Sequence, residues 1–168
     1  VLFRLITKET PPPPPEGDFR GFEVDTFKFM EDLAANNNLG WFDANRQRFK
    51  DSVDRPLRAL VKDLGEQIIT PLDPKLETSP KSNKCISRIR KNLYGKQTDN
   101  IYHEFFWAAF YRKGLTKQTD AQLFITIFPE KCTFGIYFGE QANDVQQQLV
   151  RSMGQHPELG KEVFSSLK

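Results

Sequence analysis

The 168 residues suffice for one domain with its own core, and 38% hydrophobic and 27% charged residues are typical of a soluble globular protein. No apolar run approaches the roughly 18 to 20 residues of a membrane span, which excludes a transmembrane helix. The net charge of +2 hides a strong polarity, because residues 81–117 carry nine Lys or Arg against two acids, a net +7, and the remainder is −5. Clustered positive charge favours a phosphate-bearing or other polyanionic partner.

Residues 1–17 include five consecutive prolines, Pro11 to Pro15. Proline has no backbone N–H and favours polyproline II, so this stretch predicts a semi-rigid linker or the tail of an upstream element. A ligand for a proline-recognition domain is the alternative. The chain starts at Val1 rather than at a methionine, and we expect a single α+β domain over 18–168 that belongs to a longer protein.

Two amphipathic segments in the first half of the chain predict helices. Phe22–Asn36 places apolar residues on one face at helical spacing and ends in an Asn run. Trp41–Ile68 keeps the same period for longer, and Pro56 within it must kink the helix or start a new one at Arg55. Three prolines mark residues 70–83 as a loop.

The second half changes to the period of a β-strand. Four segments alternate in polarity or are rich in aromatic and β-branched residues, and they predict strands over Cys85–Lys91, Glu104–Arg112, Ala121–Phe128 and Cys132–Phe138. The three-residue link between the last two predicts a hairpin, in which Leu123, Ile125 and Ile127 share one face.

Helical spacing returns over Asn143–Met153 and Glu158–Leu167. The order of helices, then strands, then helices indicates an α+β fold. We expect an antiparallel sheet of about four or more strands packed against N-terminal and C-terminal helices.

The cysteines and histidines argue against a metal site. Cys85 and Cys132 lie in predicted strands, and we expect two buried thiols of a cytoplasmic protein rather than a disulfide, which is the alternative. The histidines, His103 and His156, are far apart, and no cluster has zinc spacing. We expect no metal and no cofactor.

The first predicted strand of the basic segment offers a surface for an anion. If alternate side chains face the core, Lys84, Arg88 and Arg90 project together from the opposite face. Residues two positions apart on a strand lie about 6.5 to 7 Å from each other, which is close to the phosphate spacing along a DNA strand. Arginine also contacts phosphate or guanine in a bidentate manner. The alternative is a solvated face on which each arginine pairs with a helix acid; only Asp99 and Glu104 lie nearby in sequence.

Aromatic residues are interleaved with these cations. The loop 92–100 holds Tyr94 and Lys96 and could close over a ligand or wrap around a nucleic-acid backbone. It lacks the upstream glycine and the hydroxyl residue after the lysine of a P-loop. Tyr102, Trp107 and Tyr111 are candidates for an exposed platform on which a base stacks, or for a pocket around a flipped base. The alternative is that a helix covers these rings and they belong to the core.

Catalysis finds little support in the chain. There is no Gly-x-Ser-x-Gly motif, no Cys–His signature and no paired metal-ligating histidine. His103 and Glu104 are adjacent, but neighbours on a strand point to opposite faces, so they do not predict an acid–base pair.

The segment Asn36–Phe49 combines a helix end, a turn through Gly40 and a new helix that begins with two aromatic residues. Asn37 and Asn45 are expected to brace this turn through their amides. Ligand binding by the same amides is the alternative.

This segment resembles the DUF2461 family. The similarity includes the Gly21-Phe22 start, the Asn run and Trp41-Phe42 followed by Asn45, and it extends to the run Ser87–Arg90 and the hairpin within Gln122–Gly139. The acid that usually follows the arginine strand in that family is replaced here by Asn92. The resemblance implies an α+β fold and no established activity, and similar modules precede an NTPase motor in restriction-type enzymes and read DNA.

These observations predict a non-enzymatic recognition module that binds nucleic acid, most simply DNA, with a fused or associated NTPase motor and no membrane partner. The candidate binding residues are Lys84, Arg88, Arg90, Lys91, Tyr94, Lys96, Tyr102, Trp107, Tyr111, Arg112 and Lys113. A protein-interaction domain that docks an acidic partner is the first alternative, and an enzyme of unrecognised type is the second.

Overall fold

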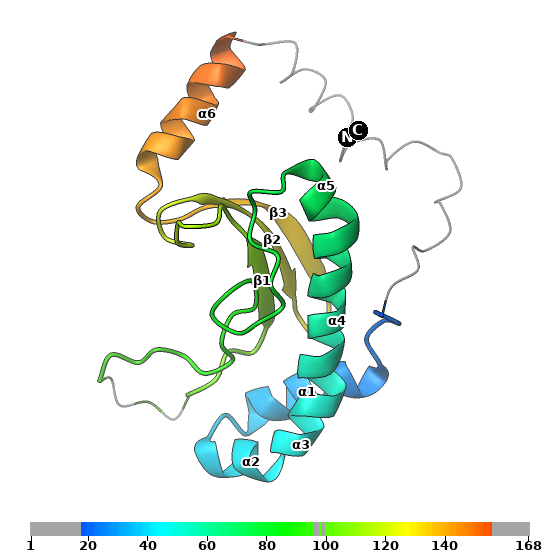
Figure 1. Ribbon diagram of the computed structural model, residues 1–168. Coiled ribbons are helices and arrows are strands. Elements are labelled where there is room, and N and C mark those ends of the chain that lie inside the picture. Colours follow the sequence, from blue (N-terminus) through cyan, green and yellow to red (C-terminus); the bar gives the residue numbers. More distant parts are fainter. Residues whose placement is uncertain (1–17, 96–97, 99, 156–168) are drawn as a thin grey trace.

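The computed structural model describes residues 18–155 apart from 96, 97 and 99 (Figure 1). The linker expected over 1–17, the helix expected over Glu158–Leu167 and the candidate binding residue Lys96 lie outside the described residues.

Two helical stretches form one layer of the fold, as the periodicity predicts. The first is α1. The second runs with little interruption from Leu39 to Leu72, so it extends three residues into the segment that was expected to be a loop. The elements are α1 (Val24–Ala35), α2 (Leu39–Ala44), α3 (Arg46–Phe49), the π-helical turn η2 (Lys50–Asp54), α4 (Arg55–Leu64), the π-helical turn η3 (Gly65–Ile69) and α5 (Thr70–Leu72).

The long helical stretch passes Pro56, and a neighbouring side chain donates to the carbonyl that the proline leaves without its α-helical donor. Helix α4 begins at Arg55, one of the two expected alternatives, and η2 precedes it. In an α-helix the N–H of residue 56 would bond the carbonyl of Ser52, which proline cannot do. The hydroxyl of Thr26 on α1 donates to that carbonyl at 2.5 Å. The contact between the two helical stretches therefore gives this carbonyl a donor, next to the π-helical turn η2 that precedes the proline.

The sheet contains three antiparallel strands in the order β1-β2-β3 within the described residues. They are β1 (Phe106–Phe110), β2 (Ala121–Ile127) and β3 (Cys132–Phe138). Residue Ile125 pairs with Ala108 on one side and Phe134 on the other, and the hairpin of β2 and β3 is confirmed.

The segment predicted as the first strand, Cys85–Lys91, is not one of the strands. It runs antiparallel along the free edge of β1 and touches it only by isolated bridges, and we call it the edge segment. The Ser87 N–H donates to the Trp107 carbonyl at 2.9 Å, and the Ile89 carbonyl accepts from the His103 N–H at 2.8 Å. The expectation of about four or more strands is therefore not confirmed.

A turn and a bend explain why the edge segment loses the regular alternation. Asn83 has a positive φ of 69°, and the turn that it starts includes Lys84 and Cys85. Cys85 and Ile86 are consecutive and both are buried, which a regular half-buried strand does not allow. A bend at Ile89 interrupts the pairing again. Lys84 therefore does not share a continuous strand face with the arginines.

One face of the sheet packs against the helices and forms the core (Figure 1). Phe106, Ala108 and Phe110 of β1 are buried there, together with Phe29 and Val61 from the helical layer. The predicted common face of β2 is confirmed, because its apolar residues Leu123, Ile125 and Ile127 all belong to this core.

The helix α6 (Asn143–Gln155) follows the end of the sheet and confirms the helical period of that region. Figure 1 shows it standing away from the sheet. Its described side chains are exposed except that of Val145, which is half-buried. The expected packing of the sheet against a C-terminal helix is thus not seen for α6. The reason is that the apolar residues of α6 are separated by too many polar residues, mainly glutamines, to form a wide apolar stripe.

The turn after α1 is fastened to the strand side of the molecule by one amide. The Oδ1 atom of Asn37 accepts from the Tyr102 N–H at 2.7 Å, and its Nδ2 atom donates to the Tyr102 carbonyl at 2.9 Å. Asn45 donates to the Trp41 carbonyl at 2.9 Å. Both amides brace backbone, as expected of them.

We predict that Asn37→Ala destabilises the fold by about 1 to 3 kcal/mol, because the N–H and the carbonyl of Tyr102 both lose their partner. Urea unfolding monitored by tryptophan fluorescence measures this. Asn36→Ala is the matched control, since Asn36 donates only to the Asp32 carbonyl at an exposed helix end. Equal losses in the two variants would contradict the bracing role.

Candidate functional site

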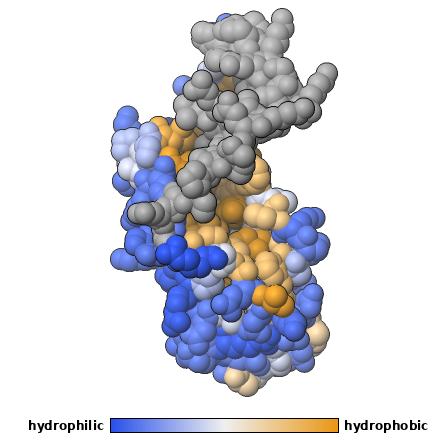
Figure 2. Space-filling model, turned by 90° about the vertical axis from the view of Figure 1, so that its right-hand side faces the viewer, coloured by the Kyte–Doolittle hydropathy of each residue, from blue (hydrophilic) through white to orange (hydrophobic). Residues whose placement is uncertain are grey.

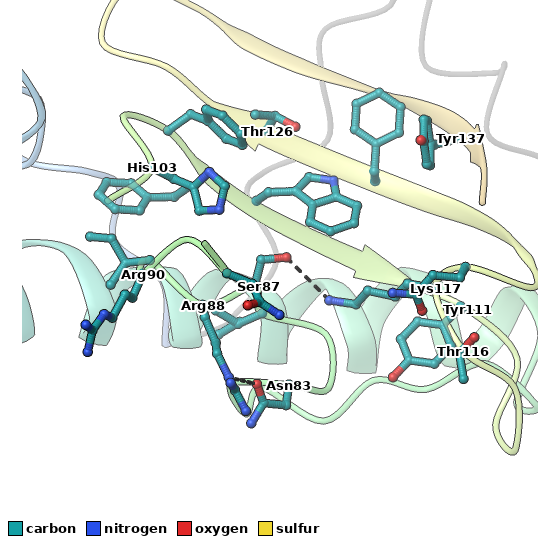
Figure 3. A pocket seen from close by; sticks show the side chains of 18 of the residues that line it. Asn83, Ser87, Arg88, Arg90, His103, Tyr111, Thr116, Lys117, Thr126 and Tyr137 are labelled. Atoms are coloured by element: carbon teal, nitrogen blue, oxygen red, sulfur yellow. Dashed lines mark hydrogen bonds between the residues drawn. The ribbon is translucent and has the colours of Figure 1, made fainter. Parts of the chain in front are cut away.

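A cleft of about 850 Å³ lies on the sheet face turned away from the helices (Figure 3). Side chains that alternate with those of the core form its floor, namely Trp107 of β1, Phe124 and Thr126 of β2, and Tyr137 of β3. The edge segment forms one wall and the loop 115–118 the other. We call this space the sheet cleft.

The floor of the sheet cleft is largely aromatic. Phe105 lies 5.4 Å from Phe128 and 5.2 Å from His103, measured between ring centroids, so these three rings make one end of the cleft. Tyr137 is 47% exposed although it lines the cleft. Flat side chains at both ends can accept a planar ligand.

No carboxylate lines the sheet cleft among the described residues. Its ionisable side chains are instead Arg88, Arg90, Lys117 and His103, together with Tyr111 and Tyr137. Burial, and then the charge of Lys91, hold the pKa of His103 below its usual value, so the imidazole is neutral at pH 7. The cleft therefore carries positive charge without internal compensation.

Lys117 is the innermost of these cations. Its Nζ atom donates to the Cys85 carbonyl at 3.2 Å and to the Ser87 Oγ atom at 3.5 Å, and Figure 3 shows the side chain reaching towards Ser87. The same atom lies 4.8 Å from the centroid of the Trp107 ring and 5.9 Å from that of Tyr111. Burial lowers the pKa of Lys117 to about 8, and no carboxylate opposes that shift.

The loop that carries Lys117 is held firmly from below. The backbone carbonyl of Lys117 accepts from the Nε2 atom of Gln122 at 2.9 Å. A Cβ atom at Gly139 would lie 2.3 Å from this carbonyl and from that of Gln118, so only glycine permits the close approach. The backbone at Lys117 is thus held by the Gln122 side chain of β2 and by the close approach of the chain at Gly139, after β3.

Arg112, a predicted phosphate contact, belongs to the support of this loop. The Arg112 guanidinium pairs with the buried carboxylate of Asp120 at 2.5 Å, and the Arg112 backbone N–H donates to the same carboxylate at 2.9 Å. Burial acts to raise the pKa of Asp120, but the hydrogen bonds and the charge of Arg112 together hold it below its usual value. The sequence indicated a cation here, but nothing in it indicated that Arg112 pairs with Asp120, eight residues later.

Three of the other predicted cations are likewise engaged outside the sheet cleft. Lys84 pairs with Glu77 at 3.3 Å, Lys113 donates to the Pro74 carbonyl at 2.9 Å, and Lys91 bonds the side chain of Asn100. None of the three lines the sheet cleft. Of the predicted cations that the structure describes, only Arg88 and Arg90 reach the cleft.

The structure places the predicted aromatic residues in three different environments. Tyr102 is 3% exposed and stacks on Phe42 with a centroid distance of 4.2 Å, so it belongs to the core and not to a stacking platform. Trp107 and Tyr111 both line the sheet cleft, although Tyr111 is only 7% exposed. Tyr94 is 87% exposed and lies outside it.

Sequence reasoning missed several residues of the sheet cleft, above all Ser87, Lys117, Phe124 and Tyr137. Lys117 was counted in the basic segment, but nothing local distinguishes it from other lysines. A useful signal for Phe124 was the alternation of β2, because its core residues are odd-numbered and its even-numbered neighbours must face away.

The cysteines partly follow expectation. Both are free; Cys85 is buried, whereas Cys132 is exposed at the start of the edge strand β3 and not buried as predicted. The described residues contain no group of three His, Cys, Asp or Glu side chains placed to hold a metal ion. No described helix is both long enough and apolar enough to cross a membrane.

Comparison with known proteins gives one match. The family DUF2461, described as "Conserved hypothetical protein", matches residues 25–166. No curated protein and no solved structure matches the chain.

We predict that Lys117→Met stabilises the fold by about 1 kcal/mol at pH 7, because the variant no longer has to remove a charged ammonium group from water. The Cys85 carbonyl keeps its bond from the Ala109 N–H. Urea unfolding at several pH values measures the effect, with the exposed Lys113→Met as control.

The pH dependence of this difference has a definite sign. The pKa of Lys117 is about 8 in the folded chain and 10.5 as the ordinary value, so the unfolded chain binds more protons between these values. The wild type should gain stability relative to Lys117→Met as the pH rises from about 8 to about 10.5. A constant difference, or a loss of more than about 1 kcal/mol at pH 7, would make Lys117 a structural residue.

Proposed function

Because the chain belongs to the DUF2461 family, whose description names no activity, we propose a function from the sheet cleft: it is a recognition module that binds nucleic acid and catalyses no reaction. The observation that carries the proposal is a cleft with an aromatic floor, cations at its walls and no carboxylate among the described lining residues. Nucleic acid matches both properties, since every base has a flat apolar face and every nucleotide carries a phosphate.

The recessed floor favours an unpaired base. A duplex keeps its bases stacked inside the helix, and the rings of Trp107 and Phe124 line a hollow rather than a protruding surface. A base from a single strand, or one turned out of a duplex, can enter such a hollow. Stacking on an aromatic ring contributes about 1 to 3 kcal/mol per base.

The arginines of the edge segment supply the contact with the backbone of the strand. Arg88 and Arg90 are exposed at the wall of the sheet cleft, and Arg90 has no ion-pair partner among the described residues. Figure 3 shows the Arg90 side chain directed away from the floor. A strand whose base occupies the cleft would therefore place its flanking phosphates near these guanidinium groups.

We further propose that the domain acts within a larger assembly. The resemblance to modules of restriction-type NTPases supports a role as the DNA-reading part of a longer cytoplasmic protein, with an NTPase motor on the same or an associated chain.

One observation favours a protein-interaction role as a second candidate. The helix-side residues of the edge strand β3, Phe134 and Ile136, are 77% and 59% exposed. Ile68 of η3 and Leu72 of α5 are exposed as well, and Figure 2 shows an apolar area on the side that faces right in Figure 1. Exposed apolar surface of this kind fits a partner protein.

We predict that the wild-type domain binds a fluorescent dT20 oligonucleotide with an affinity that falls as salt rises, because bound cations release counterions. The double variant Arg88→Gln/Arg90→Gln should lower the slope of log K against log salt by about 1.4, the contribution of two phosphate contacts on a single strand. Fluorescence anisotropy between 50 and 300 mM NaCl gives the slopes.

The charge-matched control is Lys28→Gln/Lys50→Gln, two exposed residues of the helical layer on the other side of the sheet. It should leave the slope unchanged. Absence of binding at 50 mM NaCl, or equal effects of the two double variants, would refute the proposed surface.

A further inference from the structure

Lys117 is placed to bind an anion inside the sheet cleft and not only at its walls. Its ammonium carries three N–H donors, and the described residues supply two acceptors, the Cys85 carbonyl and the Ser87 hydroxyl. Besides these acceptors, the ammonium has the aromatic rings of Trp107 and Tyr111 beside it. One hydrogen-bonding position of a partly buried cation is therefore open to a ligand.

Ser87 adds a second donor beside it. The Oγ atom of Ser87 accepts from Lys117 at 3.5 Å, which leaves the hydroxyl hydrogen to donate elsewhere. Both groups line the sheet cleft. Two convergent donors, one of them charged, form the minimal arrangement that holds an oxyanion.

The surroundings of Lys117 contain no competing negative charge within the described residues of the cleft. The ionisable groups that face it are the Cys85 thiol, whose pKa is raised to about 12 by burial, and the Tyr111 hydroxyl, whose pKa burial also raises. His103 and Arg88 line the same space. Every one of these groups is neutral or positive at pH 7, so the site lacks an anion that a ligand can provide.

We propose that Lys117 and Ser87 form an oxyanion site for a phosphomonoester, the terminal phosphate of a nucleic-acid strand or of a mononucleotide. The inference rests on the proposed function, from which it takes the base in the aromatic part of the cleft. A terminal phosphate can enter a hollow of about 850 Å³ with a single nucleotide, whereas an internal phosphodiester must bring the chain on both sides. Its second negative charge also compensates the buried ammonium better than a diester does.

The test compares three dT10 oligonucleotides, with a 5′-phosphate, with a 3′-phosphate and with hydroxyl groups at both ends. Anisotropy should show one phosphorylated form binding at least tenfold more tightly than the hydroxyl form. Lys117→Met should abolish this preference, Ser87→Ala should reduce it several-fold, and Lys113→Met, which lies outside the cleft, should keep it.

Thymidine 5′-monophosphate and 3′-monophosphate distinguish the two sources of the phosphate. Direct binding of a monophosphate, absent for thymidine and lost in Lys117→Met, supports the site even if no oligonucleotide binds, an outcome that refutes only the proposed function. A titration of the lysine Cε resonances by NMR should show that the bound monophosphate raises the pKa of Lys117.

Two results would overturn the inference and leave the proposed function standing. The first is equal affinity of the wild type for all three oligonucleotides. The second is a preference for phosphorylated ends that Lys117→Met retains, which would assign the terminal phosphate to the arginines of the edge segment. Failure of both oligonucleotides and monophosphates to bind would refute both proposals.

Discussion

The alternation of side chains along β1 constrains both the core and the sheet cleft. Phe106, Ala108 and Phe110 must face the helices, because they fill the space between the two layers. Neighbours on a strand point to opposite faces, so Trp107 is then forced to the other side. No described helix covers that side, so the edge segment and the loop around Lys117 form the walls of the cleft there. The cleft thus lies on the face of the sheet that no described helix covers.

Local patterns account for the elements that the sequence predicted. The apolar stripe of α1 and the alternation of β2 each lie within one continuous segment, and the short link over residues 128–131 fixes the pairing of β2 with β3. Pro56 also acted locally, because α4 begins at the residue before it. In each case the physical signal comes from residues within one or two turns, or one hairpin, of each other.

The misassigned residues depend on partners that are distant in the chain. Tyr102 became a core residue because Asn37, sixty-five positions earlier, holds its backbone, and because its ring stacks on Phe42. The Lys117 ammonium is held in the cleft by the Cys85 carbonyl, thirty-two positions away. A sequence shows that a lysine is present, but its burial and the absence of a nearby carboxylate follow only from tertiary packing. Charge clustering therefore pointed to the part of the chain that contributes to the sheet cleft, but it did not identify which cations line the cleft.

The sheet cleft is assembled from four stretches that are separate in the chain: the edge segment, β1, the loop 115–118, and the hairpin of β2 and β3. An unfolded chain keeps none of these together. Any molecule that touches two of the stretches must therefore bind the folded state alone, and mass action then shifts the folding equilibrium towards it. Thermal denaturation in the presence of a ligand library thus reports occupants of the cleft whatever their chemical class.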